Sequence, residues 1–324
     1  MYRVRIDSFR YHRAEMILFR FGLGLVFLMT AMWRIPVSHA ATGHLLVDCE
    51  SGHILLSKNP EEARPIASLT KIAAVLVALE WAEATGTPLS TPVPIPAKAL
   101  SGGANPLGLR AGDSVPLEAA FFAAMMASDN TSTYAFAEWI GARMGSSEKT
   151  AAGVERFVES MNGLADRLGM EKTRFVTPHG LEGTDGRSGV STAVDVARLA
   201  LAALDHSGLL RYASEVSREV VLLRAGKPLS ATLVNTNELT GSRGIDGLKT
   251  GTTRQAGPCL VVTATRDLPS GGTTRSRRLV VVLLNSEDRF REAVLLLNEG
   301  WTACESWLAA GGEIGNQCLR KPGK

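Results

Sequence analysis

The sequence contains little cysteine and few aromatic residues. Its 324 residues include four cysteines and 6% aromatic side chains. The cysteines are Cys49, Cys259, Cys304 and Cys318. None of them belongs to a Cys-x-x-Cys pair or a Cys/His cluster, so we expect neither a metal site nor another cofactor. No internal repeat is visible, and hydrophobic and charged residues make up 45% and 21% of the chain, as in ordinary globular domains.

The first 40 residues differ from the rest. Four arginines between Arg3 and Arg13 precede an apolar run from Met16 to Trp33, and Ser38-His39-Ala40 places small residues where a signal peptidase cuts. We therefore predict a signal peptide over residues 1–40 and an exported protein, periplasmic or otherwise extracytoplasmic. The alternative is an uncleaved membrane anchor, although Arg20 inside the run disfavours it. Met16 is a second possible start.

Basic charge is concentrated in this N-terminal segment. Residues 1–40 hold six arginines and two acidic residues, a net of +4, so their removal changes the formal charge from +3 to −1. The remaining chain lacks the basic balance typical of nucleic-acid-binding proteins, and we expect no nucleic-acid partner.

In an exported chain, cysteines can form disulfides. Cys304 with Cys318 is one possible pair, whereas Cys259 lies in an apolar run and is expected to be a buried small hydrophobe.

The order of predicted elements indicates an α+β fold. Short apolar runs predict strands at both ends of the chain, helical periodicity fills its middle, and a helix closes it. The strands are expected at 43–48, 53–56, 219–223, 248–253, 260–264 and 279–284, and the helices at 117–126, 131–144, 154–168, 192–204 and 288–308. The simplest arrangement is an antiparallel sheet built from both chain ends, flanked by terminal helices, with an all-helical subdomain inserted at about 85–205.

Ser68 and Lys71 stand at the predicted start of an apolar, alanine-rich helix. Pro65 disfavours helix before them, so the helix should begin at about Ser68. At a spacing of three residues the lysine amine can reach the serine hydroxyl, which is the geometry of a serine nucleophile with a lysine base. The pair alone is weak evidence, because Ser146 and Lys149 repeat it in a polar segment that we interpret as chance.

Two further motifs follow the pair. Ser128-Asp129-Asn130 lies between two predicted helices, where such a triplet is most often a helix cap. Lys249-Thr250-Gly251 opens a predicted strand, where Gly251 would let a substrate backbone approach closely. The three motifs stand 60 and then 121 residues apart, each in the structural context that its role requires. Together they are the three motifs of penicillin-interacting serine enzymes.

With these motifs the chain resembles the serine-type D-alanyl-D-alanine carboxypeptidases, the low-molecular-mass penicillin-binding proteins. The resemblance spans about residues 43–310. It also includes Pro178-His179-Gly180-Leu181 and the stretch from Asp246 to Thr253. It implies a catalytic domain over 41–315 with a short basic tail at 316–324, and a fold of the β-lactamase/DD-peptidase type. The implied substrate is a peptidoglycan stem peptide ending in D-Ala-D-Ala, and β-lactams are the implied inhibitors. No obligate protein partner is implied.

The resemblance also implies roles for individual residues. Ser68 would attack the penultimate D-Ala carbonyl, Lys71 would accept its proton, and Ser128 with Lys249 would return a proton to the leaving amine. Backbone amides of Ser68 and Thr252 would form the oxyanion hole. Asn130, Lys249, Thr250, Gly251 and Thr252 would bind the substrate. Partial burial, with Lys249 nearby, is expected to lower the pKa of Lys71.

Some features are missing or open. Only about 14 residues follow the last predicted helix, so we expect a catalytic domain without the C-terminal β-domain of larger relatives, soluble after signal cleavage. Arg243 and Arg254 are both candidates for the arginine that the family uses near the substrate carboxylate.

A class A β-lactamase shares the three motifs but needs Glu-x-x-Leu-Asn, which is absent between them, and Glu182 is the nearest substitute. His179 is expected to fix its loop rather than act as a base. A non-catalytic penicillin-binding envelope module is the remaining alternative.

Overall fold

The structure is a computed structural model that describes residues 41–144, 151–270, 273–312 and 318–319. The predicted signal peptide 1–40, the Ser146 and Lys149 pair, and nearly all of the predicted tail 316–324 lie outside the described residues. No helix in the described part of the chain is long and apolar enough to cross a membrane.

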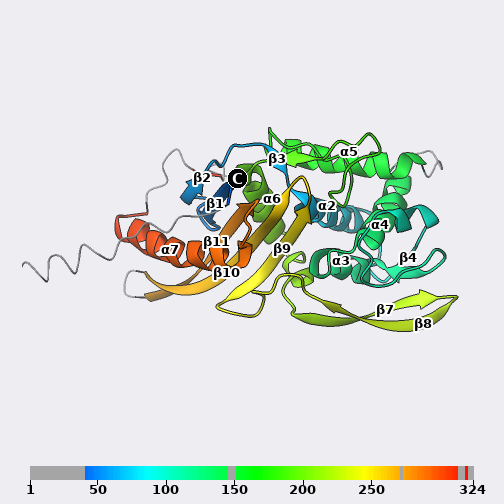
Figure 1. Cartoon of the computed structure of the whole chain (residues 1–324). Coiled ribbons are helices and arrows are strands. Elements are labelled where there is room, and N and C mark those ends of the chain that lie inside the picture. The colour runs from blue at the N-terminus through cyan, green and yellow to red at the C-terminus, as the bar shows by residue number, and fades with distance from the viewer. Residues whose placement is uncertain (1–40, 145–150, 271–272, 313–317, 320–324) are drawn as a thin grey trace, which may run out of the picture. The chain divides into compact units, whose positions relative to one another are not determined.

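Five strands form one antiparallel sheet in the order β2-β1-β11-β10-β9 (Figure 1). The strands are β1 (Gly43–Asp48), β2 (Ile54–Lys58), β9 (Ile245–Thr253), β10 (Gly257–Ser270) and β11 (Thr273–Leu284). Distant parts of the sequence pair directly, because Leu45 lies opposite Val282, and Val282 lies opposite Val261. The predicted antiparallel sheet built from both ends of the domain is thereby confirmed.

Alternate side chains of this sheet enter two separate cores. Leu45 and Val47 belong to the core that includes α6 (Ala193–Asp205), whereas Leu46 between them belongs to the core that includes α7 (Arg289–Ala309). Since successive strand residues point to opposite faces, helices cover both faces of the sheet. Figure 1 shows α7 along the strands β10 and β11.

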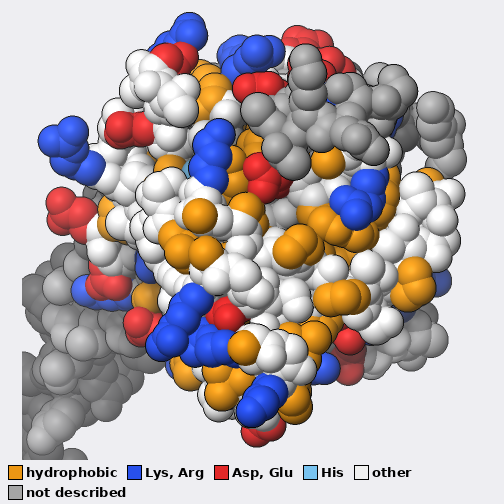
Figure 2. Space-filling model, turned by 90° about the vertical axis from the view of Figure 1, so that its right-hand side faces the viewer, with side chains coloured by type: hydrophobic (Ala, Val, Ile, Leu, Met, Phe, Trp, Pro, Cys, Tyr) orange, Lys and Arg blue, Asp and Glu red, His pale blue; other side chains and the backbone are white. Residues whose placement is uncertain are grey.

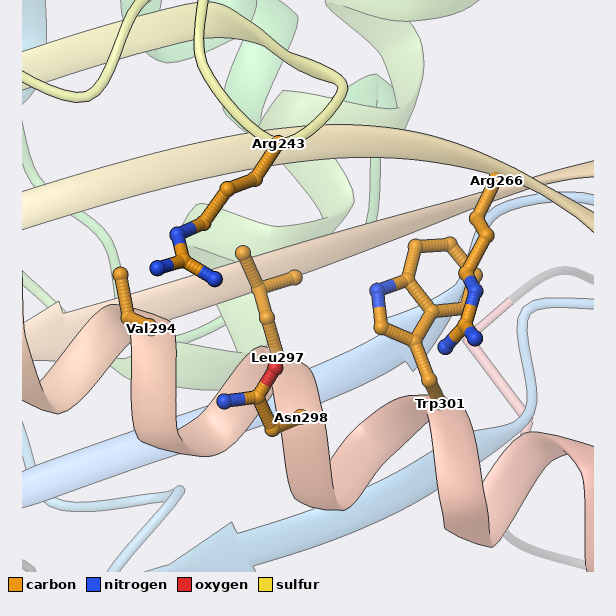
Figure 3. Close-up of a pocket in the computed structure, with 6 residues that line it drawn as sticks. All are labelled: Arg243, Arg266, Val294, Leu297, Asn298 and Trp301. Atoms are coloured by element: carbon orange, nitrogen blue, oxygen red, sulfur yellow. The ribbon is translucent and has the colours of Figure 1, made fainter.

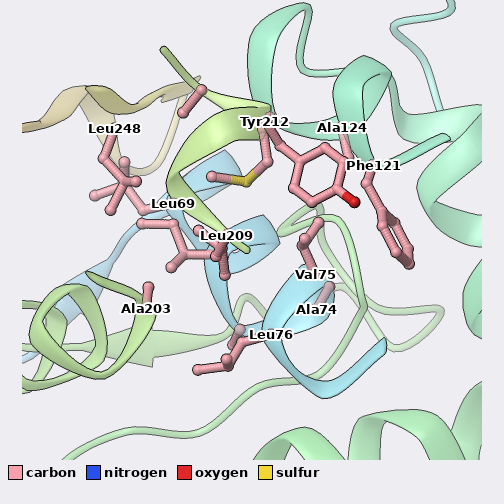
Figure 4. Close-up of a cluster of buried hydrophobic side chains, with 14 of the residues drawn as sticks. Leu69, Ala74, Val75, Leu76, Phe121, Ala124, Ala203, Leu209, Tyr212 and Leu248 are labelled. Atoms are coloured by element: carbon pink, nitrogen blue, oxygen red, sulfur yellow. The ribbon is translucent and has the colours of Figure 1, made fainter. Parts of the chain in front are cut away.

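The middle of the chain is mostly helical, but the region at about 85–205 is not all-helical as predicted, because short strands lie at 92–94, 114–116 and 190–191. It contains α2 (Thr70–Thr85), α3 (Leu117–Met126), α4 (Asn130–Arg143) and α5 (Ala151–Arg167), with the 3-10 turns η1 (Ala67–Leu69), η2 (Ala97–Ser101) and η3 (Leu210–Tyr212). Every residue of α2 from Thr70 to Leu79 is buried. Figure 4 shows Val75 and Leu76 of this helix packed among residues of α3, α6 and η3. Small alanine side chains in α2 allow this close packing, which fixes the start of the helix directly after Ser68.

A second, four-stranded sheet has the order β4-β5-β7-β8. Its strands are β4 (Pro92–Pro94), β5 (Ser114–Pro116), β7 (Ser217–Arg224) and β8 (Lys227–Val234), and a separate short ladder joins β3 (Arg64–Pro65) to β6 (Val190–Ser191). The predicted strand 219–223 is present as β7, but it pairs here rather than in the main sheet. β8 was not predicted, because only Leu233 among its eight residues is buried. Figure 2 shows the side of the chain with the helical region, where basic, acidic and apolar side chains are mixed.

Candidate active site

Ser68 lies in the 3-10 turn η1, directly before α2. The α-helix begins at Thr70, two residues later than predicted, and η1 connects β3 to it. Ala67 has a φ of 49°, in the left-handed region where side chains other than glycine are strained. Such strain is often found at functional sites. The Ser68 side chain is partly exposed, so a ligand can reach it.

Lys71 is fully buried and faces three acceptors. Its Nζ donates to Ser68 Oγ at 2.9 Å, to Asn130 Oδ1 at 2.6 Å and to the His179 carbonyl oxygen at 2.9 Å. Burial lowers the pKa of Lys71 to about 7, because an ammonium group loses its hydration inside the protein, and the nearby Asp129 carboxyl opposes this shift. A neutral amine, able to accept a proton, is therefore accessible near neutral pH.

The Ser128-Asp129-Asn130 triplet combines a helix cap with a link to Lys71. Asp129 is the N-cap of α4, and its Oδ1 accepts a hydrogen bond from the Ser132 backbone N–H at 2.7 Å. Asn130 bonds Lys71 through Oδ1 and donates from Nδ2 to the Gly102 carbonyl oxygen at 2.6 Å. Ser128 has a left-handed φ of 58°. Its hydroxyl makes no hydrogen bond to either lysine of the motifs among the described residues.

Lys249 and Thr250 lie on β9, the edge strand of the main sheet. Lys249 is 1% exposed, and its Nζ donates to the Thr250 carbonyl oxygen at 3.0 Å. Burial lowers the pKa of Lys249 well below its usual value, and the positive charges of Lys71 and Arg289 lower it further. The hydroxyls of Thr250 and Thr236 lie 2.6 Å apart. Two lysines with depressed pKa values thus belong to one region of the protein, which is a common property of functional sites.

The strand β9 lies directly against the turn that carries Ser68. A β-carbon on Gly251 would be 3.0 Å from the Ser68 backbone nitrogen and 3.1 Å from the Ile66 carbonyl oxygen. Only glycine allows the two backbones to come so close without a shift. The Lys249-Thr250-Gly251-Thr252 strand and the Ser68 turn therefore form adjoining parts of one site.

Gly180, in the loop that contains Pro178-His179-Gly180-Leu181, supports the same turn. Its φ is 85°, and a β-carbon there would lie 2.0 Å from the Ala67 carbonyl oxygen.

We expect Gly180→Ala to destabilise the protein by about 3 kcal/mol or more, because the left-handed strain adds to a backbone clash. The matched control is Gly186→Ala. Gly186 has a φ of 77°, and no atom lies within 4 Å of the place that a β-carbon would take, so only about 1–2 kcal/mol of strain is expected. Urea unfolding measures the free energy of unfolding of both variants. Equal losses of stability would contradict the backbone clash at Gly180.

His179 and Glu182 differ in their contacts although both lie in this loop. His179 is 6% exposed, its Nδ1 accepts from the Leu181 backbone N–H at 3.3 Å, and burial together with the Lys71 charge lowers its pKa to about 3. The imidazole is therefore neutral and bonded within its own loop. Glu182 is exposed, and its carboxylate accepts a hydrogen bond from Gln255 Nε2 at 2.6 Å.

Arg289 reaches the motif strand although sequence reasoning did not select it. Its Nη1 donates to the Gly251 carbonyl oxygen at 3.0 Å, to Thr252 Oγ1 at 2.9 Å and to the Cys259 carbonyl oxygen at 3.2 Å. It is the first residue of α7. The only sequence signal for this position was Asp288, whose side chain caps α7. This cap sets the start of the helix at Arg289.

The two arginines considered from the sequence lie elsewhere. Arg243 lines a pocket of about 280 Å³ between the main sheet and α7 (Figure 3). The other residues of this pocket are Arg266, Val294, Leu297, Asn298 and Trp301. Arg254 is exposed in the turn between β9 and β10. In the described residues, no cluster of three or more His, Cys, Asp or Glu side chains could hold a metal ion.

Comparison with solved structures identifies the class of fold. The Streptomyces K15 DD-transpeptidase aligns with a TM-score of 0.71 and 26% identity, covering 82% of this chain and 98% of that one. Penicillin-binding protein D2 from Listeria monocytogenes, in an ampicillin-bound form, aligns with a TM-score of 0.64 and 27% identity over 82% of this chain and 99% of that one. The chain thus has the fold of the DD-peptidases, or penicillin-binding proteins.

Sequence comparison gives the family. The family described as Peptidase_S11, D-alanyl-D-alanine carboxypeptidase, matches residues 30–287, and the chain belongs to this family of serine peptidases. It is 31% identical to D-alanyl-D-alanine carboxypeptidase DacC of Escherichia coli K12 over 82% of this chain, and 28% identical to DacF of Bacillus subtilis 168 over 83%. The matched regions span 62% and 64% of those two relatives.

Proposed function

We propose that the protein is a serine DD-carboxypeptidase that removes the terminal D-Ala from peptidoglycan stem pentapeptides. The observation that carries this proposal is the buried Lys71 amine, 2.9 Å from Ser68 Oγ and with a pKa lowered to about 7. A base with this pKa is half deprotonated at neutral pH, so it can activate a serine hydroxyl. Release of D-Ala from a pentapeptide that ends in D-Ala-D-Ala tests the activity. Because this substrate lies outside the cytoplasm, we also infer export.

In the proposed reaction, Ser68 Oγ attacks the carbonyl carbon of the penultimate D-Ala while its proton passes to Lys71. The backbone N–H groups of Ser68 and Thr252 stabilise the negative oxygen, a contribution of about 3 to 4 kcal/mol for one such donor in a well-studied protease. Ser128 and Lys249 deliver a proton to the leaving D-Ala amine. Water then hydrolyses the acyl-enzyme and restores the Ser68 hydroxyl.

Substrate binding would use the groups around this pair. Asn130, which already bonds Lys71 and the Gly102 carbonyl, holds the amide of the substrate from the helical side. The space beside Gly251 is filled by the backbone of the Ser68 turn rather than left open, so the substrate backbone would lie along the edge strand β9, and Thr250 with Arg289 binds the terminal carboxylate. A β-lactam presents a carboxylate and a reactive amide in a similar arrangement, so we infer that β-lactams acylate Ser68 and inhibit the enzyme.

Arg289 gives a test of carboxylate recognition. Charge-assisted hydrogen bonds are worth about 1.5 to 3 kcal/mol, so Arg289→Met should lower kcat/KM about 10- to 100-fold, mainly by raising KM. The loss should shrink when the substrate ends in an amide, because that group carries no charge for the guanidinium to bind. Arg254→Met is the matched control and should leave kcat/KM unchanged for both substrates. An equal loss for acid and amide would show that Arg289 only supports the strand.

Glu182 tests the β-lactamase alternative. In that mechanism a glutamate activates the deacylating water, so Glu182→Gln would trap a penicilloyl-enzyme that the wild type clears within seconds. The Glu182 carboxylate is exposed and bonded to Gln255. We therefore expect the lifetime of the penicilloyl-enzyme to remain unchanged, within about twofold, when followed by intact-protein mass spectrometry. A much longer lifetime in the variant would favour the lactamase.

A further inference from the structure

The backbone nitrogen of Ala41 meets a buried carboxylate at the start of the described chain. It lies 3.0 Å from Glu292 Oε1 and 2.9 Å from Oε2. Ala41 is fully buried and Glu292 is 5% exposed. Ala41 also belongs to the core between the main sheet and α7, together with Leu296 of that helix. This contact joins residues 251 positions apart and belongs to neither the nucleophile nor the motif strand.

The geometry suits an ammonium group better than a peptide amide. A peptide nitrogen has a single hydrogen, which must be shared between the two carboxylate oxygens. An α-ammonium in the same place has three hydrogens, so each oxygen can receive its own, and it adds a full positive charge beside a buried negative one. Ser286, also fully buried, donates from Oγ to Glu292 Oε2 at 2.5 Å and fixes the carboxylate.

Ala41 is the residue that would become the N-terminus if the predicted signal peptide were removed after Ala40. We propose that Glu292 is a built-in receptor for this new N-terminus, so that processing creates an internal ion pair. A signal peptidase would hydrolyse the peptide bond between Ala40 and Ala41 with one water, leaving a carboxylate on Ala40 and an ammonium group on Ala41. The ammonium then remains on the Glu292 carboxylate that the amide already contacts.

The ion pair would stabilise the part of the fold that borders the candidate active site. Glu292 lies one turn after Arg289 on α7, and Arg289 bonds Gly251 and Thr252. Ser286 donates from its backbone N–H to the Pro258 carbonyl oxygen at 2.8 Å, and Pro258 lies opposite Thr252 in the sheet. The receptor is thus connected on two sides to the strand that carries the third motif.

Thermal unfolding of four forms of the protein tests the proposal. They are the processed wild type, processed Glu292→Gln, an uncleaved chain carrying Ala40→Gln, and the uncleaved chain with both changes, all in the same detergent. Glutamine keeps the shape of the side chain but removes its charge. We expect Glu292→Gln to lower the Tm of the processed chain by roughly 4 °C or more, and that of the uncleaved chain by less than half as much. Equal losses would show that Glu292 is only an acceptor for an amide and would overturn the proposal.

Two measurements on the processed wild type keep the proposal testable if the variants fold poorly. Intact mass should give a chain that begins at Ala41, and any other N-terminus overturns the proposal. An amine-reactive ester at neutral pH should modify the Ala41 amine much more slowly in the folded protein than in urea. Equal rates would place the amine in solvent, against the proposal. Neither result depends on peptidase activity, which D-Ala release measures separately.

Discussion

Ser68→Ala should abolish covalent labelling by a fluorescent penicillin and lower D-Ala release by roughly 10⁴-fold or more. The alanine has no oxygen to form the acyl bond, and removal of the nucleophile in a comparable serine peptidase costs about 10⁶ in kcat. The fold should be unaffected, because the Ser68 side chain is partly exposed and its hydroxyl accepts its hydrogen bond from Lys71. Gel fluorescence and a D-Ala assay measure the two losses.

The control for this experiment is Ser146→Ala. Ser146 begins the second Ser-x-x-Lys of the chain, which we interpret as chance, so its removal should leave labelling and release unchanged. Circular dichroism on both variants separates a loss of chemistry from a loss of fold. Labelling of Ser68→Ala at the wild-type level would place the nucleophile elsewhere.

Lys71→Arg should lower the rate of acylation by about 10²- to 10⁴-fold, the usual contribution of a general base. Arginine keeps a positive charge of similar reach, but its guanidinium does not lose a proton in proteins and so cannot accept one from Ser68. Lys172→Arg is a matched control, because Lys172 is half exposed and pairs with Glu61 at the surface. Stopped-flow acylation by a chromogenic β-lactam measures the rates.

The pH dependence distinguishes loss of a base from loss of packing. The base acts in its neutral form, and the pKa of Lys71 is about 7. In the wild type the acylation rate should therefore rise about tenfold per pH unit below that value and level off above it. Lys71→Arg should remove this rising part of the profile, whereas Lys172→Arg should keep it. A wild-type rate that is flat from about pH 5 to 8 would contradict the assignment of Lys71 as the base.

Much of the fold could be predicted because its signals are local. Helical periodicity located α3 to α7 within three residues, and apolar runs located β1, β9, β10 and β11. The second sheet was harder to predict, because β8 exposes most of its side chains and has no apolar run. β8 pairs with β7 across the two-residue turn Ala225-Gly226, but the hairpin joins the sheet through Leu223 opposite Ser114, and this contact depends on where the helical region places the two segments.

The candidate site could be predicted where spacing alone brings groups together. The three-residue spacing within one helical turn brings Lys71 Nζ within hydrogen-bond distance of Ser68 Oγ. The order of the motifs suggested that Asn130 and Lys249 lie near this pair. Arg289 was missed because its contact with Thr252 spans 37 residues and depends on how α7 crosses the sheet. The cause of the Lys71 pKa shift was also only partly anticipated: full burial of the side chain dominates it, and this follows from packing around α2.

The most direct test of the account is to identify the atom that is acylated. The purified protein is incubated with a β-lactam or with a thioester analogue of acyl-D-Ala-D-Ala, quenched in acid, digested and mapped by mass spectrometry. The account predicts one adduct per chain, on Ser68, and release of D-Ala from the pentapeptide by the same preparation. A protein that binds β-lactams without an adduct on Ser68 and releases no D-Ala would be a non-catalytic binding module, and the account would be wrong.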